Sequence, residues 1–144
     1  MPETYDLHRF VDAQRGVYDE VLAELRSGRK RTHWIWFVFP QLAGLGNSVM
    51  AQRYAISSGG EARAYLKHPV LGPRLRECAR IVNGLKGRTI EEIFGWPDKL
   101  KVRSSMTLFA ECAETATDRE EFRALLTKYY GGEPDPATLD RLSG

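Results

Sequence analysis

The sequence predicts an all-α fold, a compact single-domain bundle of about six to eight helices, several of them short. Apolar residues recur three and four positions apart through most of the 144 residues, which is the spacing of a helix buried on one face. Capping motifs and glycine stops divide this pattern into segments. No two alternating segments are joined by a two-residue hairpin turn, so paired strands are not expected. We expect one domain over residues 1–144, with a core of about residues 7–142.

The first helix is expected over residues 7–25, with Asp6 as its N-cap and Gly28 just after its end. Gly16 lies inside this pattern, and we expect the helix to tolerate it, since an interior glycine costs about 1 kcal/mol. The segment that follows the glycine-bearing turn at Gly44–Gly46 predicts two short helices, with a break between them at the Ser-Ser-Gly-Gly stretch.

The second half of the chain contains several helix start signals. They are Pro69, where the missing N–H costs nothing, the capping box Thr89–Glu92, the cap Asp98, a second capping box at Thr117–Glu120, and Asp135–Pro136. Glycines after these segments supply the stops. In the helix that starts at Asp98, the apolar spacing predicts an inward stripe of Val102, Met106 and Phe109.

Residues 28–46, GRKRTHWIWFVFPQLAGLG, join a basic turn to an aromatic run and then to a turn with two glycines. The run WIWFVF alternates like a strand, but a single strand has nothing to pair with. The basic and titratable residues are Arg29, Lys30, Arg31 and His33. They form either a solvated turn after a helix end or the mouth of an anion site. The aromatic residues after them either anchor the core or form the floor of that site.

A second unusual stretch is GWPDKLKVRSSMTLF, residues 95–109. Ser104 and Ser105 are adjacent inside a predicted helix, where serine is neutral to unfavourable, so packing or hydrogen bonding must compensate. Arg103 lies close to the apolar stripe, and a buried guanidinium requires a partner. It either caps another helix or pairs with a glutamate, or it joins the serines in binding an anion.

Several classes of function lack their signatures. The sequence has no phosphate-binding GK[ST] loop, no GxGxxG, no GxSxG elbow and no HExxH. Cys78 and Cys112 are not clustered with each other or with histidine, so we expect neither a metal site nor a cofactor. The net charge of +2 argues against nucleic-acid binding. The longest apolar stretch is too short to span a membrane and the N-terminus has no signal-peptide pattern, so a cytoplasmic location is expected.

The segments quoted above, together with RYAI, EARAYLKHPVLGPRLREC and YYGG, resemble the uncharacterised bacterial family called domain of unknown function 1810. The resemblance runs from about Leu7 to Leu142 and implies a compact all-α single domain. It implies no established activity, and the calpastatin label sometimes given to the family has no support in this sequence. The sequence departs from the family pattern at one point. After Pro97 that pattern has two acidic residues, whereas here Asp98 is the single acidic residue and is followed by Lys99 and Lys101.

These features predict a pocket between residues 29–46 and the helix that carries Arg103, which binds a phosphorylated or nucleotide-like molecule. Hydrolysis or glycosidic transfer is the reaction class to test first, and His33 is the catalytic candidate because histidine is the residue type best suited to shuttle protons. The predicted ligand-binding residues are Arg29, Lys30, His33, Trp34, Trp36, Gln41, Arg53, Arg103, Ser104 and Ser105. The alternatives are a non-enzymatic protein-interaction module, with Trp34 or Trp36 exposed, and a weak nucleic-acid binder. Nothing in the sequence predicts an oligomeric state.

Overall fold

The computed structural model describes residues 5–143 and contains ten helices over that range. They are α1 (His8–Gln14), α2 (Tyr18–Arg26), α3 (Ile35–Val38), α4 (Val49–Arg53), α5 (Gly59–Lys67), α6 (Leu71–Gly84), α7 (Ile90–Phe94), α8 (Asp98–Cys112), α9 (Ala116–Tyr130) and α10 (Pro136–Ser143). The all-α prediction is confirmed. Within residues 5–143 the β-type pairing is one isolated parallel bridge between Leu42 and Ile56.

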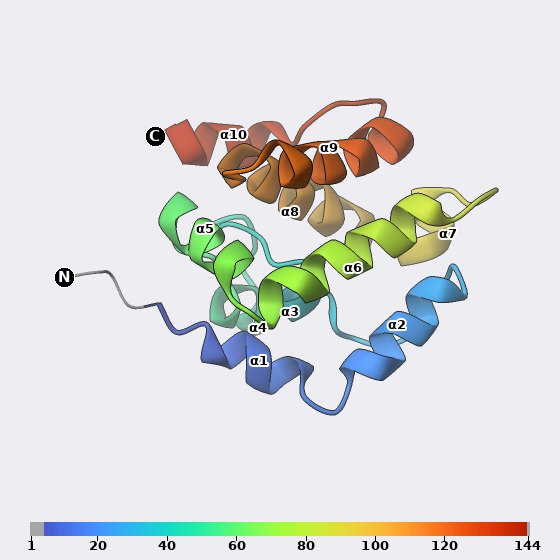
Figure 1. Ribbon diagram of the computed structural model, residues 1–144, viewed down its shortest axis with the longest axis horizontal. Helices are drawn as coiled ribbons and strands as arrows, with labels where there is room; N and C mark the ends of the chain where they lie inside the picture. Colours follow the sequence, from blue (N-terminus) through green and yellow to red (C-terminus); the bar gives the residue numbers. More distant parts are fainter. Residues whose placement is uncertain (1–4, 144) are drawn as a thin grey trace.

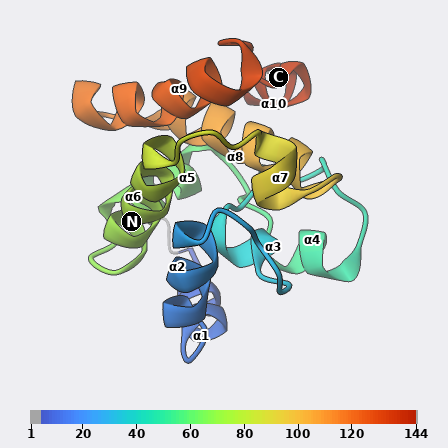
Figure 2. The same ribbon diagram turned by 90° about the vertical axis from the view of Figure 1, so that its right-hand side faces the viewer.

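Helix α8 is the centre of the bundle and packs against α3, α5, α7, α9 and α10. Figures 1 and 2 both show α9 and α10 on one side of the molecule and α1 and α2 on the opposite side, with α8 between them. Helix α6 crosses the structure diagonally and contacts α2 at one side and α9 at the other. None of the helices described for residues 5–143 has the length and apolar character needed to cross a bilayer.

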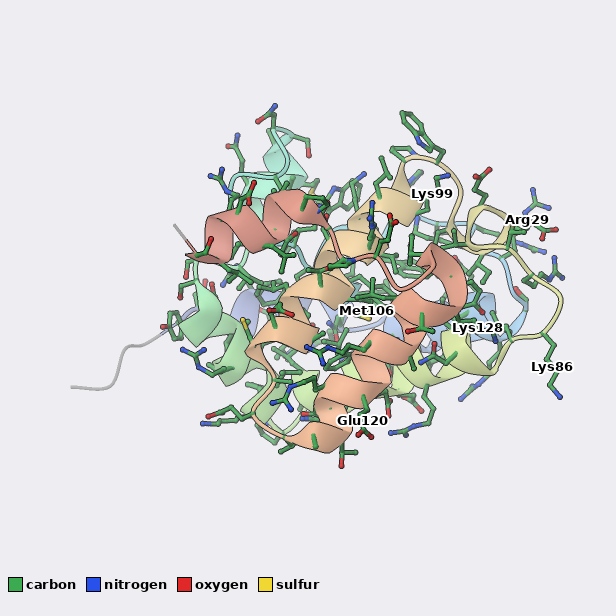
Figure 3. The ribbon with its side chains drawn as sticks, turned by 90° about the horizontal axis from the view of Figure 1, so that it is seen from above. Arg29, Lys86, Lys99, Met106, Glu120 and Lys128 are labelled. Carbon is green, nitrogen blue, oxygen red and sulfur yellow. The ribbon has the colours of Figure 1, made fainter. Side chains whose placement is uncertain are left out.

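The burial of α8 follows from its apolar stripe. Val102, Met106 and Phe109 are fully buried, as the spacing predicted. Met106 lies beneath the ribbons at the middle of the molecule, whereas Arg29 and Lys86 project at its edge (Figure 3). A helix so thoroughly enclosed fixes the positions of the elements around it, including the loops at both of its ends.

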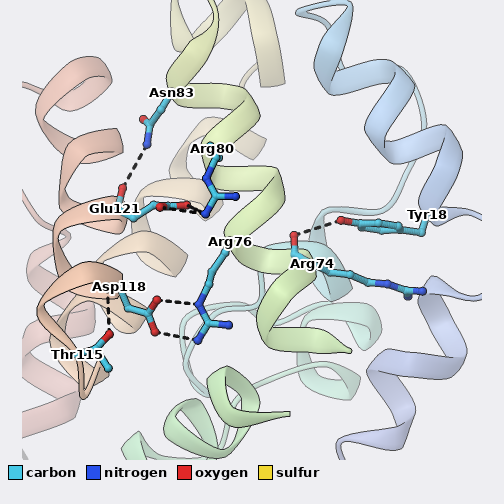
Figure 4. A network of polar contacts seen from close by, with 8 residues as sticks. All are labelled: Tyr18, Arg74, Arg76, Arg80, Asn83, Thr115, Asp118 and Glu121. Atoms are coloured by element: carbon cyan, nitrogen blue, oxygen red, sulfur yellow. Dashed lines mark hydrogen bonds and ion pairs between the residues drawn. The ribbon is translucent and has the colours of Figure 1, made fainter. Parts of the chain in front are cut away.

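Polar contacts as well as apolar packing join α6 to α9 (Figure 4). The guanidinium of Arg76 binds the carboxylate of Asp118 with two hydrogen bonds, Nε to Oδ1 at 2.7 Å and Nη2 to Oδ2 at 2.8 Å. Asp118 is buried, and its hydrogen bonds from Arg76 hold the pKa of the carboxyl below its usual range. Further along, the side chain of Asn83 donates to the backbone of Glu121.

The single first helix predicted over residues 7–25 is wrong, because the chain breaks at Gly16. This glycine has φ +81°, a left-handed conformation that other residues rarely adopt, and α1 and α2 meet at an angle around it (Figure 1). The predicted cap is also wrong. Leu7 occupies the N-cap position of α1, and no side chain caps that end.

The other helix boundaries agree in part with the predictions. The capping box of Thr89 and Glu92 is present, and Gly131 ends α9 in the left-handed conformation. The second capping box, predicted at Thr117–Glu120, is wrong, because Thr115 caps α9 by accepting a hydrogen bond from Asp118 N. Likewise α6 begins at Leu71 rather than at Pro69, since His68 Nδ1 accepts from the N–H groups of residues 70 and 71.

Candidate functional site

The buried carboxylate of Glu24 accepts hydrogen bonds from the basic turn and from the first residue of the aromatic run. Glu24, near the end of α2, accepts hydrogen bonds at Oε1 from Arg31 N (2.7 Å), Thr32 N (3.0 Å) and Trp34 Nε1 (3.0 Å), and at Oε2 from Thr32 Oγ1 (2.6 Å). Burial alone would raise the pKa of Glu24, but these hydrogen bonds together lower it below the ordinary value. The backbone N–H groups of the basic turn therefore bind a carboxylate of the protein itself, that of Glu24.

Trp34 belongs to the core. It is 2% exposed, its ring lies against Phe39 and Phe94, and its one donor is used by Glu24. Trp36 is half-buried and packs against the same core. Of the two alternatives for the aromatic residues, Trp34 therefore follows the first and anchors the core.

Lys30 connects the basic turn to the start of α8. Its ammonium lies 2.8 Å from Asp98 Oδ2 and 5.1 Å from the centre of the Trp34 ring, and its side chain is only 6% exposed. Its N–H donates to Ile93 O at 2.7 Å. Residues 29–46 and α8 are thus neighbours, as the sequence predicted, but the contact between them is an internal ion pair.

The predicted basic and titratable residues do not converge on one place. Arg29 and Lys30 line a polar cavity of about 390 Å³ together with Arg88 and the residues of α7. His33 is exposed and lines none of the cavities described for residues 5–143. Arg53 is exposed on α4 beside the ring of Tyr54. The structure does not bring these four residues together at one site.

A different cavity joins the two segments that the sequence singled out. It has a volume of about 450 Å³ and is enclosed by the loop and first turn of α4, the start of α8 and the start of α10; we refer to it as the α4–α8–α10 cavity. Its polar lining residues are Gln41, Asn47, Ser48, Lys101, Arg103, Ser104 and Asp135. Its apolar lining residues are Leu45, Ala51, Pro97, Leu100 and Ala137, and Gly46 completes the wall.

Backbone hydrogen bonds fix the loop around Gln41, which forms one wall of this cavity. Gln41 O accepts from Ile56 N, and Ile56 O accepts from Ala43 N, both at 2.8 Å, so the loop is pinned to the segment between α4 and α5. Arg141 from α10 donates to Ala43 O at 2.8 Å and ties the loop to the C-terminal helix. Within residues 5–143 the side-chain amide of Gln41 has no hydrogen-bond partner, whereas its backbone oxygen accepts from Ile56 N.

The cations of the cavity both have partners in the protein. Arg103 donates from Nε to Glu133 O and from Nη2 to Pro134 O, each at 3.0 Å, and it fixes the connection between α9 and α10. This agrees with the structural alternative for Arg103, an arginine that caps carbonyls after another helix. Lys101 Nζ lies 3.3 Å from Asp98 Oδ1, so Asp98 is shared between Lys30 and Lys101.

Of the ten predicted site residues, three line the α4–α8–α10 cavity: Gln41, Arg103 and Ser104. Ser105 is fully buried, and its hydroxyl has no partner within residues 5–143. The structure adds Lys101, which lies one turn before Ser104 on α8, and Asp135, which the sequence marked only as a helix start. Their signal was their spacing from Ser104 along α8 and the Asp-Pro pair, which places a carboxylate at the beginning of α10.

The exposed tryptophan is Trp96, at 71% exposure, and not the residues of the aromatic run. It precedes Pro97, which lines the cavity, and Leu100 is 45% exposed on the same wall. An apolar surface therefore lies beside the polar lining. Trp96 stands alone in the sequence, outside the dense aromatic run, so no aromatic pattern predicts a site at this position.

Comparison with known proteins places the chain in a family without assigning it an activity. The crystal structure of the conserved hypothetical protein Rv1873 from Mycobacterium tuberculosis is similar over 99% of both chains, with 58% sequence identity and a TM-score of 0.94. No curated protein matches the chain. The model of the family described as "Protein of unknown function (DUF1810)" matches residues 4–142. With this match across nearly the whole sequence, the resemblance is confirmed, and the chain belongs to the DUF1810 family.

Proposed function

We propose that this protein binds a small anionic molecule, phosphorylated or nucleotide-like, in the α4–α8–α10 cavity. The observation that carries the proposal is that Gln41, whose side-chain amide has no hydrogen-bond partner within residues 5–143, and Lys101 both line one hollow of about 450 Å³. Pockets for small molecules fall in the range of about 300–1,000 Å³ and combine apolar walls with a few polar groups. Both features are present here.

The charges that line the cavity favour an anion. Lys101 and Arg103 contribute two positive charges and Asp135 one negative charge, so the lining has a net charge of +1. Lys101 is bound by a carboxylate that it shares with Lys30, so an incoming phosphate can draw it away without leaving Asp98 unpaired. The apolar wall of Pro97, Leu100 and Leu45 offers a surface for a ring.

The chemistry of the cavity supports binding more directly than catalysis. No histidine or cysteine is among its lining residues, and no group of metal-binding residues occurs in the described part of the chain. His33, the sequence's candidate proton shuttle, lies outside the cavity. Any ligand that binds should still be followed for hydrolysis or glycosidic transfer, because Asp135 offers a carboxylate within the site.

The test is a thermal-shift screen with nucleoside phosphates, ADP-ribose and sugar phosphates, followed by calorimetric titration of each hit. A ligand at 100 times its Kd stabilises the folded state by about 2.7 kcal/mol, which raises Tm by several degrees. Lys101→Met and Gln41→Ala should each weaken binding at least tenfold. Lys67→Met, which changes an exposed lysine at the end of α5, is the matched control and should bind as wild type.

The proposal fails if no compound in the panel shifts Tm. It also fails if a hit binds Lys101→Met and Gln41→Ala as tightly as wild type, since the site would then lie elsewhere.

A protein-interaction role is a second candidate, favoured by the exposed Trp96 and Leu100. Exposed aromatic residues often anchor protein interfaces. Light scattering on wild type and on Trp96→Ala tests the simplest form of it, self-association. If wild type remains monomeric at high concentration, self-association is excluded.

A further inference from the structure

Asp135 lies where α8, the α9–α10 connection and α10 meet, and the fold uses one of its two carboxylate oxygens. Oδ2 accepts from Ser104 Oγ at 3.0 Å, from Thr138 Oγ1 at 2.6 Å and from Thr138 N at 3.2 Å. The backbone N–H of Asp135 donates to Thr107 Oγ1 at 2.8 Å. Thr138 and Thr107 are buried, so these bonds hold the carboxylate in one orientation.

The other oxygen, Oδ1, has no hydrogen bond or ion pair with any residue in the range 5–143. It is not one of the buried unpaired atoms either, so it is accessible to solvent. Asp135 is half-buried and lines the α4–α8–α10 cavity. The two cations of the cavity do not neutralise it, because Arg103 binds carbonyls and Glu133, and Lys101 binds Asp98.

We propose that Asp135 Oδ1 is the specificity-determining acceptor of the cavity, and that the ligand is an anion that also carries a hydroxyl or amino group. This inference rests on the proposed function and deepens it. A fixed, ionised oxygen gains a charge-assisted hydrogen bond from an O–H or N–H donor. It repels a bare anion placed against it and loses solvation to an apolar group.

The proposed ligand has two ends. Its anionic end binds Lys101 and the Gln41 amide, and its donor end binds Asp135, all of which line the cavity. Sites built to hydrogen-bond a hydroxyl discriminate strongly against analogues that lack it. Phosphorylated polyols and ribonucleotides fit this pattern, whereas inorganic phosphate and alkyl phosphates fit only one end.

The test uses two matched pairs of probes, AMP with 2′,3′-dideoxy-AMP and glycerol 3-phosphate with propyl phosphate. Each pair is titrated into wild type and into Asp135→Asn. Asparagine keeps one oxygen for Ser104 and Thr138 and remains a good N-cap, but it places an NH₂ donor where Oδ1 stood. The exposed Asp140→Asn on α10 is the control, since it makes the same chemical change outside the cavity.

For at least one pair, we expect wild type to bind the hydroxylated member at least tenfold more tightly, and Asp135→Asn to reduce that preference below threefold. The loss should come from weaker binding of the hydroxylated probe, with the other probe unchanged or tighter. Asp140→Asn should keep the wild-type preference. In wild type, the Asp135 carboxyl ¹³C resonance should shift with the hydroxylated probe and not with its partner, and this measurement does not require the variant to fold.

The possible failures are distinguishable. Equal binding of both members by wild type, an unchanged preference in Asp135→Asn, or an Asp135 resonance that does not move overturns the role of Asp135 while the proposed binding site stands. Binding of none of the four probes, nor of any compound in the wider panel, overturns the proposed function and this inference with it.

Discussion

The indole of Trp34 donates a hydrogen bond to the carboxylate of Glu24, with 3.0 Å between Nε1 and Oε1. The same carboxylate accepts the N–H groups of Arg31 and Thr32, so one buried acid near the end of α2 organises the turn that leads into α3. The carboxylate therefore fixes the backbone of the basic turn and the first ring of the aromatic run together. The anion that the turn's backbone binds is the Glu24 carboxylate of the protein itself. The aromatic run begins at Trp34, where the chain enters the core.

We predict that Glu24→Gln lowers the free energy of unfolding by about 2–3 kcal/mol at neutral pH, because hydrogen bonds to a charged acceptor are stronger and the amide offers one acceptor instead of two. Urea denaturation followed by circular dichroism measures the change. Glu20→Gln, an exposed residue of the same helix, is the control and should change stability by less than about 0.5 kcal/mol.

The same substitution should change how stability depends on pH. The pKa of Glu24 is lowered in the folded state, so its contribution is present above the ordinary glutamate pKa and is lost as the pH falls through that value toward the lowered one. Wild type should therefore lose more stability on acidification than Glu24→Gln. The pKa of Asp118 is lowered as well, which leaves a smaller acid dependence in the variant. Identical pH profiles for the two proteins would contradict this account.

The fold could be predicted from the sequence because apolar spacing and local capping are short-range signals. The stripe of α8 and the box at Thr89 depend on residues within a few turns of each other, and both are present. The break at Gly16 could not be predicted, because an interior glycine costs a helix only about 1 kcal/mol, whereas the contact of α2 with α6 joins segments distant in the sequence. Tertiary contacts decided that position.

We predict that Trp96 dominates the quenching of tryptophan fluorescence by acrylamide. Trp96 is 71% exposed and Trp34 is 2% exposed, so Trp96→Phe should sharply reduce the quenchable fraction and shift the remaining emission to the blue. Trp34→Phe should leave quenching nearly unchanged and instead lower stability by about 1–3 kcal/mol, through the cavity it leaves and the loss of one of the three hydrogen bonds to Glu24 Oε1. A quenching profile dominated by Trp34 would contradict the packing described for α3.

The pair of Lys30 and Asp98 should show a coupling energy of about 1–3 kcal/mol in a double-mutant cycle with Lys30→Met and Asp98→Asn. Their side chains are 6% and 19% exposed, and the contact joins the basic turn to the first turn of α8. The control cycle is Lys67 with Glu114, whose side chains are 70% and 50% exposed at a similar distance of 2.9 Å. That pair should couple by less than about 0.5 kcal/mol. Equal coupling in the two cycles would show that burial does not strengthen the first pair.

The candidate site was less predictable than the fold, because a cavity depends on which residues distant in the sequence meet. Residue type and helical position suggested Arg103 as an anion ligand, but its guanidinium reaches the carbonyls of residues 133 and 134. Asp135 gave only a helix-start signal, and its place beside Ser104 follows from the way α10 folds back onto α8. Neither contact has a local sequence signature, since each joins segments about thirty residues apart.

The adjacent serines of α8 should respond in opposite ways to removal of their hydroxyls. Ser104 Oγ donates to Asp135 Oδ2, so Ser104→Ala should lower stability by about 1–2 kcal/mol. Ser105 Oγ is buried with no partner in residues 5–143, so Ser105→Ala removes an unsatisfied group and should leave stability unchanged or raise it by up to about 1 kcal/mol. Urea denaturation of both variants measures the difference.

Ser105 does not line the α4–α8–α10 cavity, so Ser105→Ala should bind ligand as wild type, whereas Ser104→Ala loosens Asp135 and should weaken binding of hydroxylated probes. A marked destabilisation by Ser105→Ala would mean that its hydroxyl has a buried partner such as an ordered water.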